Sequence, residues 1–236
     1  MGGFFVVKGE NMKTVGIIGG LGPETTARFY MEVVFACSKI SGKRPQILIS
    51  SVGIPLKIEK EIITEAKNEK NILPFLIDTT RQLERAGADF IVIPCNTAHI
   101  FIKEIRKAVK IPVLSIVEET SIFLRKEKIK EVGLLATAAT IKNKLFDENL
   151  KRRGIKIKTP DDSNQSKIGV VINRLINNLH NERDKKEILE IINELRVKNV
   201  VLACTDLQIL NIKCNGVKIF DSMDILAKAT IKEQLQ

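Results

Sequence analysis

Short apolar runs alternate with longer amphipathic segments along most of the chain. Runs over residues 15–20, 46–52, 89–93 and 111–115 predict buried strands, each followed by a segment with helical spacing. The spacing is clearest over residues 71–86, which end before Gly87. We also predict helices over 24–39, 97–109 and 118–127, and a loop with part of a helix over 57–70. Strands that alternate with helices in this way are typical of α/β proteins with parallel sheets.

The pattern starts again after residue 130. It predicts strands over 132–136, 155–158, 200–203 and 217–220, and helices over 141–153, 167–178, 184–197 and from 222 onward. Four elements recur in the same order at a nearly constant offset, which predicts two pseudo-symmetric lobes, each a parallel sheet flanked by helices, with the active site in the cleft between them. We divide the chain into an N-terminal lobe with Cys95 (1–112 and 215–236) and a C-terminal lobe with Cys204 (113–214).

The composition excludes several classes of protein. Of the 236 residues 44% are hydrophobic, and no apolar run approaches the roughly 18 residues of a membrane span. We expect a cytoplasmic protein without a membrane partner, and a non-native or poorly ordered extension over residues 1–11. The net charge of +10 is spread along the chain without a nucleic-acid-binding motif, so no nucleic-acid partner is expected. This positive field would mildly attract an anionic small substrate.

The cysteines and histidines do not form a metal-binding pattern. The four cysteines include no C-x-x-C pair, and the chain has only two histidines. No metal is therefore expected. Cys37 and Cys214 are interpreted as small apolar residues of the core.

A glycine-rich loop, Gly19-Gly20-Leu21-Gly22-Pro23, joins the first strand to its helix. Its spacing is not that of a dinucleotide fingerprint, and no acidic residue ends a second strand about 20 residues later. We interpret it as a tight β–α turn, where a small anion could still bind at the helix N-terminus.

Cys95 and Cys204 stand apart because each follows a predicted buried strand and precedes a helix start. Ligands of open α/β sheets bind beyond the carboxyl ends of the strands, so we expect the two thiols on opposite walls of one cleft. Backbone N–H groups at a helix start favour the thiolate. Two such groups can invert the configuration of one carbon, because a thiolate removes the α-proton from one face and a thiol supplies a proton to the other.

The neighbours of the two cysteines leave some roles open. Asn96, Thr97 and Thr205 offer short polar groups suited to a carboxylate. Asp206 is either a solvated carboxylate at a helix start or a group that tunes Cys204. A Cys–His hydrolase built on Cys95 and His99 is an alternative, although no third orienting residue is evident. The other interpretation of His99 is a residue that caps or packs near the helix start.

These stretches resemble the aspartate/glutamate/hydantoin racemase superfamily, and most closely its cofactor-independent aspartate racemases. The resemblance runs from Val15 to the C-terminal helix and rests on the loop 19–23, Pro94-Cys95-Asn96-Thr97-Ala98-His99, Leu134-Leu135-Ala136-Thr137 with Thr140, and Cys204-Thr205-Asp206. It implies two-base Cys/Cys racemisation without pyridoxal phosphate or metal, and frequent homodimers. By this resemblance Cys95 and Cys204 are catalytic, Asp206 supports them, and the substrate-binding residues are Lys57, Asn96, Thr97, Thr137, Thr140 and Thr205.

The chain also departs from the family pattern. Asp206 stands where the family usually has Glu, and Ala139 replaces a usual Gly. Lys57 stands at the place of the arginine that reads the distal carboxylate in aspartate racemases, and Ser166 at the place of a further lysine.

We therefore predict an amino-acid racemase that acts on aspartate or a related acidic amino acid. The alternatives are an enzyme like maleate isomerase, which also uses two cysteines, and a ligand-binding homologue without turnover.

Overall fold

A computed structural model describes residues 12–236, apart from the side chains of residues 63–65. The extension predicted for residues 1–11 lies outside the described residues. The strands are β1 (Val15–Gly19), β2 (Ile47–Ser51), β3 (Phe90–Val92), β4 (Glu131–Ala136), β5 (Lys156–Lys158), β6 (Asn199–Ala203) and β7 (Lys218–Asp221). The α-helices are α1 (Pro23–Ser41), α2 (Leu56–Glu65), α3 (Leu73–Arg85), α4 (Ile102–Ala108), α5 (Ile116–Lys126), α6 (Ala138–Lys142), α7 (Asp147–Arg152), α8 (Asp162–Ile176), α9 (Glu182–Leu195) and α10 (Ser222–Gln234). The short 3₁₀ helices are η1 (Glu69–Ile72), η2 (Thr97–Phe101) and η3 (Thr205–Leu210).

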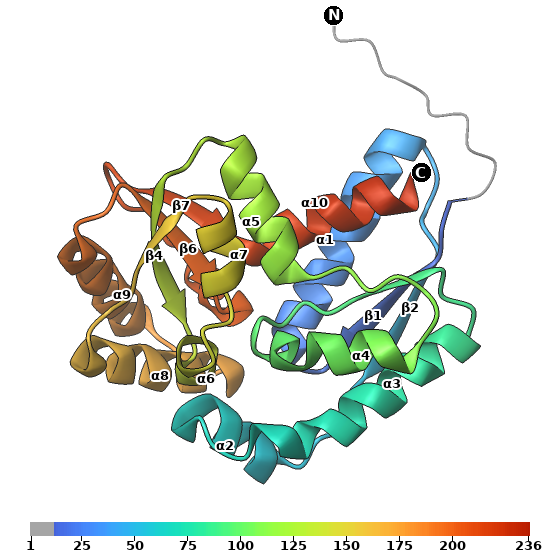
Figure 1. Ribbon diagram of the computed structural model, residues 1–236, viewed down its shortest axis with the longest axis horizontal. Helices are drawn as coiled ribbons and strands as arrows, with labels where there is room; N and C mark the ends of the chain where they lie inside the picture. Colours follow the sequence, from blue (N-terminus) through green and yellow to red (C-terminus); the bar gives the residue numbers. More distant parts are fainter. Residues whose placement is uncertain (1–11) are drawn as a thin grey trace, which may run out of the picture.

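The strands form two parallel sheets flanked by helices (Figure 1). In the first sheet β1 lies between β2 and β3, and in the second β4 lies between β5 and β6, with β7 beyond β6. The central strands β1, β4 and β6 consist almost entirely of buried residues, as expected for strands that helices cover on both faces. The predicted α/β class with two parallel sheets is confirmed.

The two sheets repeat one strand order. The strand predicted over 111–115 is reduced to a single parallel bridge between Val113 and Ile91, because Pro112 has no N–H with which to extend the ladder. With this bridge, the first sheet runs β2, β1, β3 and Val113, and the second runs β5, β4, β6 and β7. This is the correspondence that the internal repeat predicts.

The predicted lobe boundaries at residues 113 and 215 do not follow this strand pairing. β7 pairs with β6 and so belongs to the second sheet, whereas Val113 bridges to the first. The helices that follow these strands cross to the other lobe. α10 reaches the first lobe, where the carbonyl of Gln234 accepts a hydrogen bond from the backbone N–H of Lys13, and α5 packs between α10 and α7 (Figure 1). Each last strand thus completes its own sheet, while the helix that follows it covers the other lobe.

A shared apolar core joins the two lobes. It combines side chains of β1, α1 and β3 with those of β4, β6, α5 and α10, and Phe146 joins it from the residue before α7; Phe29, Phe90 and Phe146 are fully buried. Two further clusters fill the outer sides, one against α3 and α4 and the other against α8 and α9. Because the lobes share a core, the strand ends that carry Cys95 and Cys204 are held in a fixed relation to each other.

Some helix boundaries differ from prediction. The helix expected over 141–153 is divided into α6 and α7, because Lys144 adopts the left-handed conformation with φ of 49°. α6 begins earlier than expected, since the hydroxyl of Thr137 caps it by accepting the N–H of Thr140 at 3.2 Å. Part of the 57–70 segment forms α2, as predicted. No helix within residues 12–236 is long and apolar enough to cross a membrane.

Candidate active site

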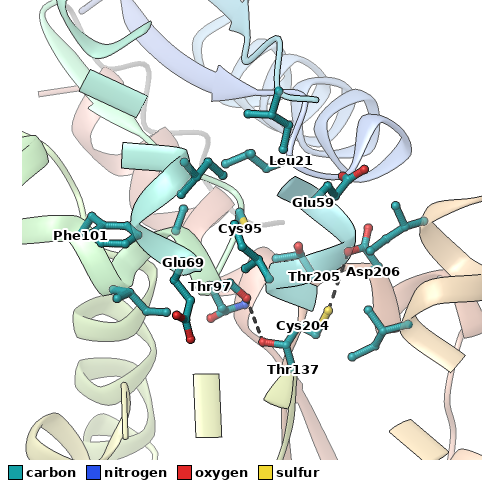
Figure 2. A pocket seen from close by; sticks show the side chains of 18 residues that line it. Leu21, Glu59, Glu69, Cys95, Thr97, Phe101, Thr137, Cys204, Thr205 and Asp206 are labelled. Atoms are coloured by element: carbon teal, nitrogen blue, oxygen red, sulfur yellow. Dashed lines mark hydrogen bonds between the residues drawn. The ribbon is translucent and has the colours of Figure 1, made fainter. Parts of the chain in front are cut away.

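Cys95 and Cys204 line one cavity between the lobes (Figure 2). Cys95 follows β3 after Ile93 and Pro94, and Cys204 directly follows β6. The cavity has a volume of about 620 Å³, including space open to solvent. Equivalent strand ends of the two lobes therefore present one thiol each to the same space.

The structure brings together most of the residues singled out in the sequence. The lining includes both cysteines and four predicted substrate-binding residues, namely Asn96, Thr97, Thr137 and Thr205, together with Asp206. Thr140 is buried behind this lining. Lys57 is outside it, because its side chain is 86% exposed and lies 4.0 Å from Glu61 on the same helix. Ser166 is also outside the lining.

The Cys95 thiol is surrounded by apolar groups and backbone N–H groups. Burial raises its pKa to about 12, and the negative charges of Asp206 and Glu59 add to the rise. The backbone N–H groups of Ala98 and Thr97 act in the opposite direction and favour the thiolate. The free protein therefore holds Cys95 as a thiol at neutral pH.

Cys204 has a carboxylate partner. Its thiol donates to Oδ2 of Asp206 across 3.7 Å (Figure 2). Burial, followed by the charge of Asp206, raises the pKa of Cys204 well above its ordinary value, while the backbone N–H of Asp206 favours the thiolate. The pKa of Asp206 is itself raised by burial, which makes this carboxylate a suitable acceptor for the thiol proton.

Asp206 occupies the anion position that the glycine-rich loop suggested. Its Oδ1 accepts a hydrogen bond of 2.6 Å from the hydroxyl of Thr25 in the first turn of α1. A Cβ placed on Gly22, whose φ is +103°, would lie 2.7 Å from the same oxygen. The loop therefore needs glycine at position 22 because a carboxylate of the other lobe approaches the start of α1 there.

Three threonine hydroxyls connect the lobes on the Cys95 side. Oγ1 of Thr97 lies 2.9 Å from that of Thr137 and 3.3 Å from that of Thr140, and Thr137 donates to Thr140 at 3.0 Å. On the other side, the hydroxyl of Thr205 donates to the carbonyl of Pro94 at 3.2 Å. Thr97 and Thr137 both line the cavity, and Thr97 is the one whose hydroxyl proton can turn to a carboxylate, because Thr137 already donates to Thr140.

Asn96 lines the cavity and carries an acceptor without a partner within residues 12–236. Its Nδ2 donates to the hydroxyl of Ser222 at 3.0 Å, and that hydroxyl donates to the carbonyl of Leu202 at 2.8 Å. Because Ser222 has only one proton to donate, this chain fixes which end of the Asn96 amide is the nitrogen. The Oδ1 atom of Asn96 is buried and has no hydrogen-bond partner among the described residues. The sequence interpretation of Asn96 as a carboxylate donor does not match this orientation.

His99 is a structural residue rather than a base for Cys95. Its Nε2 accepts the backbone N–H of Ile116 at 3.1 Å, so its Nδ1 carries the proton and donates to the carbonyl of Cys95 at 2.8 Å. Burial lowers the pKa of His99 to about 4. Both ring nitrogens are engaged, and neither contacts a thiol, so the geometry does not favour the Cys–His hydrolase.

Glu59 and Glu69 line the cavity and were missed by the sequence interpretation. Lys57 and Glu59 lie on opposite sides of α2, since two residues correspond to about 200° of an α-helix. Ile62, three residues after Glu59, also lines the cavity and marks the inner face. The apolar spacing of this helix was the signal that could have favoured Glu59 over Lys57. Within residues 12–236, no group of three or more His, Cys, Asp or Glu side chains is placed to hold a metal ion.

The comparisons with known proteins agree with this architecture. The family model described as Asp/Glu/Hydantoin racemase matches residues 18–230. The chain is 31% identical over 234 residues to the broad specificity amino-acid racemase RacX of Bacillus subtilis, covering 94% of this chain and 98% of that protein. Among solved structures, the aspartate racemase of Picrophilus torridus is 28% identical with a TM-score of 0.80, covering 94% of each chain. An aspartate racemase homologue from Pyrococcus horikoshii is 26% identical with a TM-score of 0.75, covering 95% of this chain and all of that one. The chain therefore belongs to the Asp/Glu/hydantoin racemase family and is an isomerase of the racemase class.

Proposed function

We propose that the protein racemises a free amino acid by exchange of its α-proton between Cys95 and Cys204, without a cofactor. The observation that carries this proposal is the presence of one thiol from each lobe in a single cavity, at equivalent strand ends. The similarity to amino-acid racemases over nearly the whole chain supports it.

The proposed reaction starts with one thiol deprotonated. On the Cys204 side, the contact between Sγ and Oδ2 of Asp206 gives the thiol proton a path to the carboxylate. The thiolate takes the α-proton of one enantiomer, and the electron pair of the broken C–H bond is delocalised into the α-carboxylate. The other thiol gives its proton to the opposite face of the carbon and becomes a thiolate. The reverse reaction uses the same steps with the roles of the two cysteines exchanged.

Different polar residues of the lining suit the α-carboxylate and the α-ammonium group of the amino acid. The hydroxyl of Thr97 can turn from Thr137 to donate to the α-carboxylate, where it stabilises the charge that develops in the transition state, while Thr137, which donates to Thr140, orients Thr97. The unpartnered Oδ1 of Asn96 is an acceptor and is better matched to the α-ammonium group. Thr140 supports the two threonines from behind, and Thr205 is held by its bond to Pro94.

The expectation of an acidic substrate stays a prediction. It is supported by the similarity to the aspartate racemase of P. torridus. It also requires a cation near the distal carboxylate, and Lys57 is exposed and outside the lining.

The assembly and location are likewise expectations. A homodimer is supported by exposed apolar side chains on α1, namely Met31 at 47% and Phe35 at 55% exposure. Equilibrium sedimentation would test it. A cytoplasmic location would keep both thiols reduced.

Incubation of single amino-acid enantiomers in D₂O tests the proposed reaction. We expect loss of the α-proton signal together with loss of optical rotation. Cys95→Ser and Cys204→Ser should each lower racemisation by at least about 10²-fold, as expected when an acid or base is removed. Wild-type activity in either variant would rule out the two-base scheme. Turnover of maleate without α-proton exchange of any amino acid would favour the maleate isomerase alternative.

A further inference from the structure

The cavity that holds the two thiols is acidic. Its charged lining residues are Glu59, Glu69 and Asp206, and among the described residues no lysine or arginine lines it (Figure 2). This is the opposite of the whole chain, whose net charge is +10. A substrate with a second carboxylate would meet like charges there, whereas a cationic side chain would meet opposite charges.

We propose that the substrate is an amino acid whose side chain ends in an ammonium or guanidinium group, and that Glu59 selects it. This inference rests on the proposed racemisation and names the substrate class for it. Glu59 is then a specificity-determining residue, and the two cysteines exchange the α-proton as proposed above.

Glu59 is the carboxylate of the cavity that lacks a partner. Within the described part of the chain it has neither a salt bridge nor a hydrogen bond, although its side chain is half-buried. Burial and the nearby charge of Asp206 raise the pKa of Glu59. A partly buried carboxylate without a partner is unfavourable, and a cation in the cavity would offset that cost.

The other two carboxylates are already engaged. Asp206 is held by Thr25 and faces the thiol of Cys204. Glu69 lies 3.7 Å from Nζ of Lys142 and 3.5 Å from Nδ2 of Asn143, on the second lobe. Glu59 is therefore the carboxylate available to the distal group of a substrate.

The buried Oδ1 of Asn96 offers an acceptor for the α-ammonium group that is separate from Glu59. It lies in a residue that is only 2% exposed, and it lacks a donor among the described residues. Any amino acid could satisfy it with the α-ammonium group. When Asn96 takes that group, Glu59 remains for a second positive charge, as in ornithine, lysine or arginine.

The position of α2 fits this role. α2 belongs to the first lobe but packs against α6 and α8 of the second (Figure 1). Side chains on its inner face, Glu59 and Ile62, line the cavity together with Ile172 and Ile176 of α8. These apolar groups suit the methylene chain of a long cationic side chain, and Glu59 suits its charged end.

Matched substrate pairs separate the distal charge from the rest of the amino acid. Ornithine is compared with norvaline, and lysine with norleucine, because the members of each pair differ chiefly in the terminal ammonium group. Aspartate and glutamate serve as acidic comparators. The rate of α-deuterium exchange in D₂O gives kcat/KM, and isothermal titration of the Cys95→Ser variant gives affinity without turnover.

We expect the wild-type protein to prefer ornithine or lysine over the neutral partner by about 10-fold to 100-fold, the value of a charged hydrogen bond. Glu59→Gln should abolish most of this preference in both rate and affinity, and should leave norvaline and norleucine nearly unchanged. Glu59→Lys should shift the preference toward aspartate. Glu61→Gln is the matched control, because it removes the same charge from the same helix outside the cavity lining and should leave the preference intact.

The outcomes distinguish this inference from the proposed function. Faster exchange or tighter binding of aspartate than of ornithine would overturn it, as would an equal loss for charged and neutral substrates in Glu59→Gln. Absence of exchange with every amino acid would instead overturn the racemisation proposal. In that case the titration still decides whether the cavity selects a cationic side chain and whether Glu59 is responsible.

Discussion

The two cysteines occupy equivalent positions, yet the residues two places after them differ. Thr97 follows Cys95 and contacts Thr137 and Thr140 at the start of α6, whereas Asp206 follows Cys204 and contacts Thr25 at the start of α1. Each cysteine loop therefore touches the first helical turn of the opposite lobe. The repeat has conserved the contact between lobes but replaced a neutral hydroxyl in one half by a carboxylate in the other.

This difference means that the two thiols are not equivalent as bases. Cys204 has a carboxylate at 3.7 Å to which its proton can pass, while the Cys95 thiol has only backbone N–H groups. The equilibrium constant between enantiomers is one, so kcat/KM for racemisation must be equal in both directions. The asymmetry should appear instead in the pH dependence and in α-proton exchange without inversion.

Asp206→Asn is expected to have the largest effect on activity. Racemisation should fall by about 10²-fold, because the acceptor for the Cys204 proton is lost. The charge of Asp206 raises the pKa of Cys204, so removal of the charge should move the ascending limb of kcat/KM toward lower pH. The readout is a pH–rate profile from pH 6 to 10. If kcat/KM falls but the ascending limb stays at the same pH, the role given to the Asp206 carboxylate is contradicted.

The same variant should be more stable than the wild type at neutral pH. Burial raises the folded-state pKa of Asp206 above its unfolded value, so the folded state binds the proton more tightly. Folding stability from this group is then greatest below the unfolded pKa and is lost as pH rises through the folded pKa. Urea unfolding at pH 7 and pH 4 measures this. A gain in Asp206→Asn at pH 7 that shrinks at pH 4 is the expected result.

His99 makes the Cys95 half sensitive to acid. Its pKa is lowered to about 4 by burial, so the unfolded chain binds more protons between that value and the ordinary pKa of 6.5. Stability should be fully present above pH 6.5 and fall by about 3 kcal/mol as pH drops toward 4. Gln208 holds the equivalent position in the other half. His99→Gln should therefore flatten this dependence of the free energy of unfolding.

His180→Gln is the control, since it removes the other histidine, which does not line the cavity. Both ring nitrogens of His99 are hydrogen-bonded, so His99 should not change kcat/KM of the wild type near pH 6.5. A histidine limb that disappears in His99→Gln would show that the ring acts on Cys95 after all.

Much of this comparison could be predicted from the sequence. The apolar runs identified the central strands, and the offset between Cys95 and Cys204 identified the repeat, since both depend on local pattern. The partners of Thr97 and Asp206 could not be found in this way. Those contacts form only after two sheets pack through a shared core, and their partners lie 40 and 181 residues away in sequence.

Helix orientation explains where the structure departs from the sequence-based positions. Lys57 was predicted because it is a cation at the place of the family's arginine, yet α2 turns it to solvent and turns Glu59 toward the cavity. The charge of a side chain does not specify its direction, whereas the apolar residues of the same helix do. Similarly, β7 and α10 follow each other in sequence but pack on different lobes. A single boundary at residue 215 assigns both elements to the same lobe.

Gly22→Ala tests the close approach in the Cys204 half. The added Cβ would lie 2.7 Å from Oδ1 of Asp206, in a backbone conformation with φ of +103°. We expect a loss of about 2 kcal/mol or more in the free energy of unfolding and about a tenfold loss of racemisation as Asp206 is displaced. Gly42→Ala is the matched control, since its φ is +73° but nothing lies within 4 Å of the new Cβ. Equal losses in both variants would show that backbone strain, and not the approach to Asp206, causes the effect of Gly22→Ala.

Thr140→Val should have the smallest effect and tests the hydroxyl contacts of the Cys95 half. The substitution keeps the shape but removes the hydroxyl that bonds Thr137 and lies 3.3 Å from Thr97. We expect a loss of about 1 kcal/mol in the free energy of unfolding and a fewfold loss of racemisation, because the two cavity threonines lose their support. Thr120→Val is the control, since the Thr120 hydroxyl is fully buried in α5 with no partner among the described residues. Its removal should be neutral or stabilising. If Thr140→Val behaves like Thr120→Val in both assays, the threonine contacts do not support the Cys95 half-site, and only the carboxylate side depends on contact between the lobes.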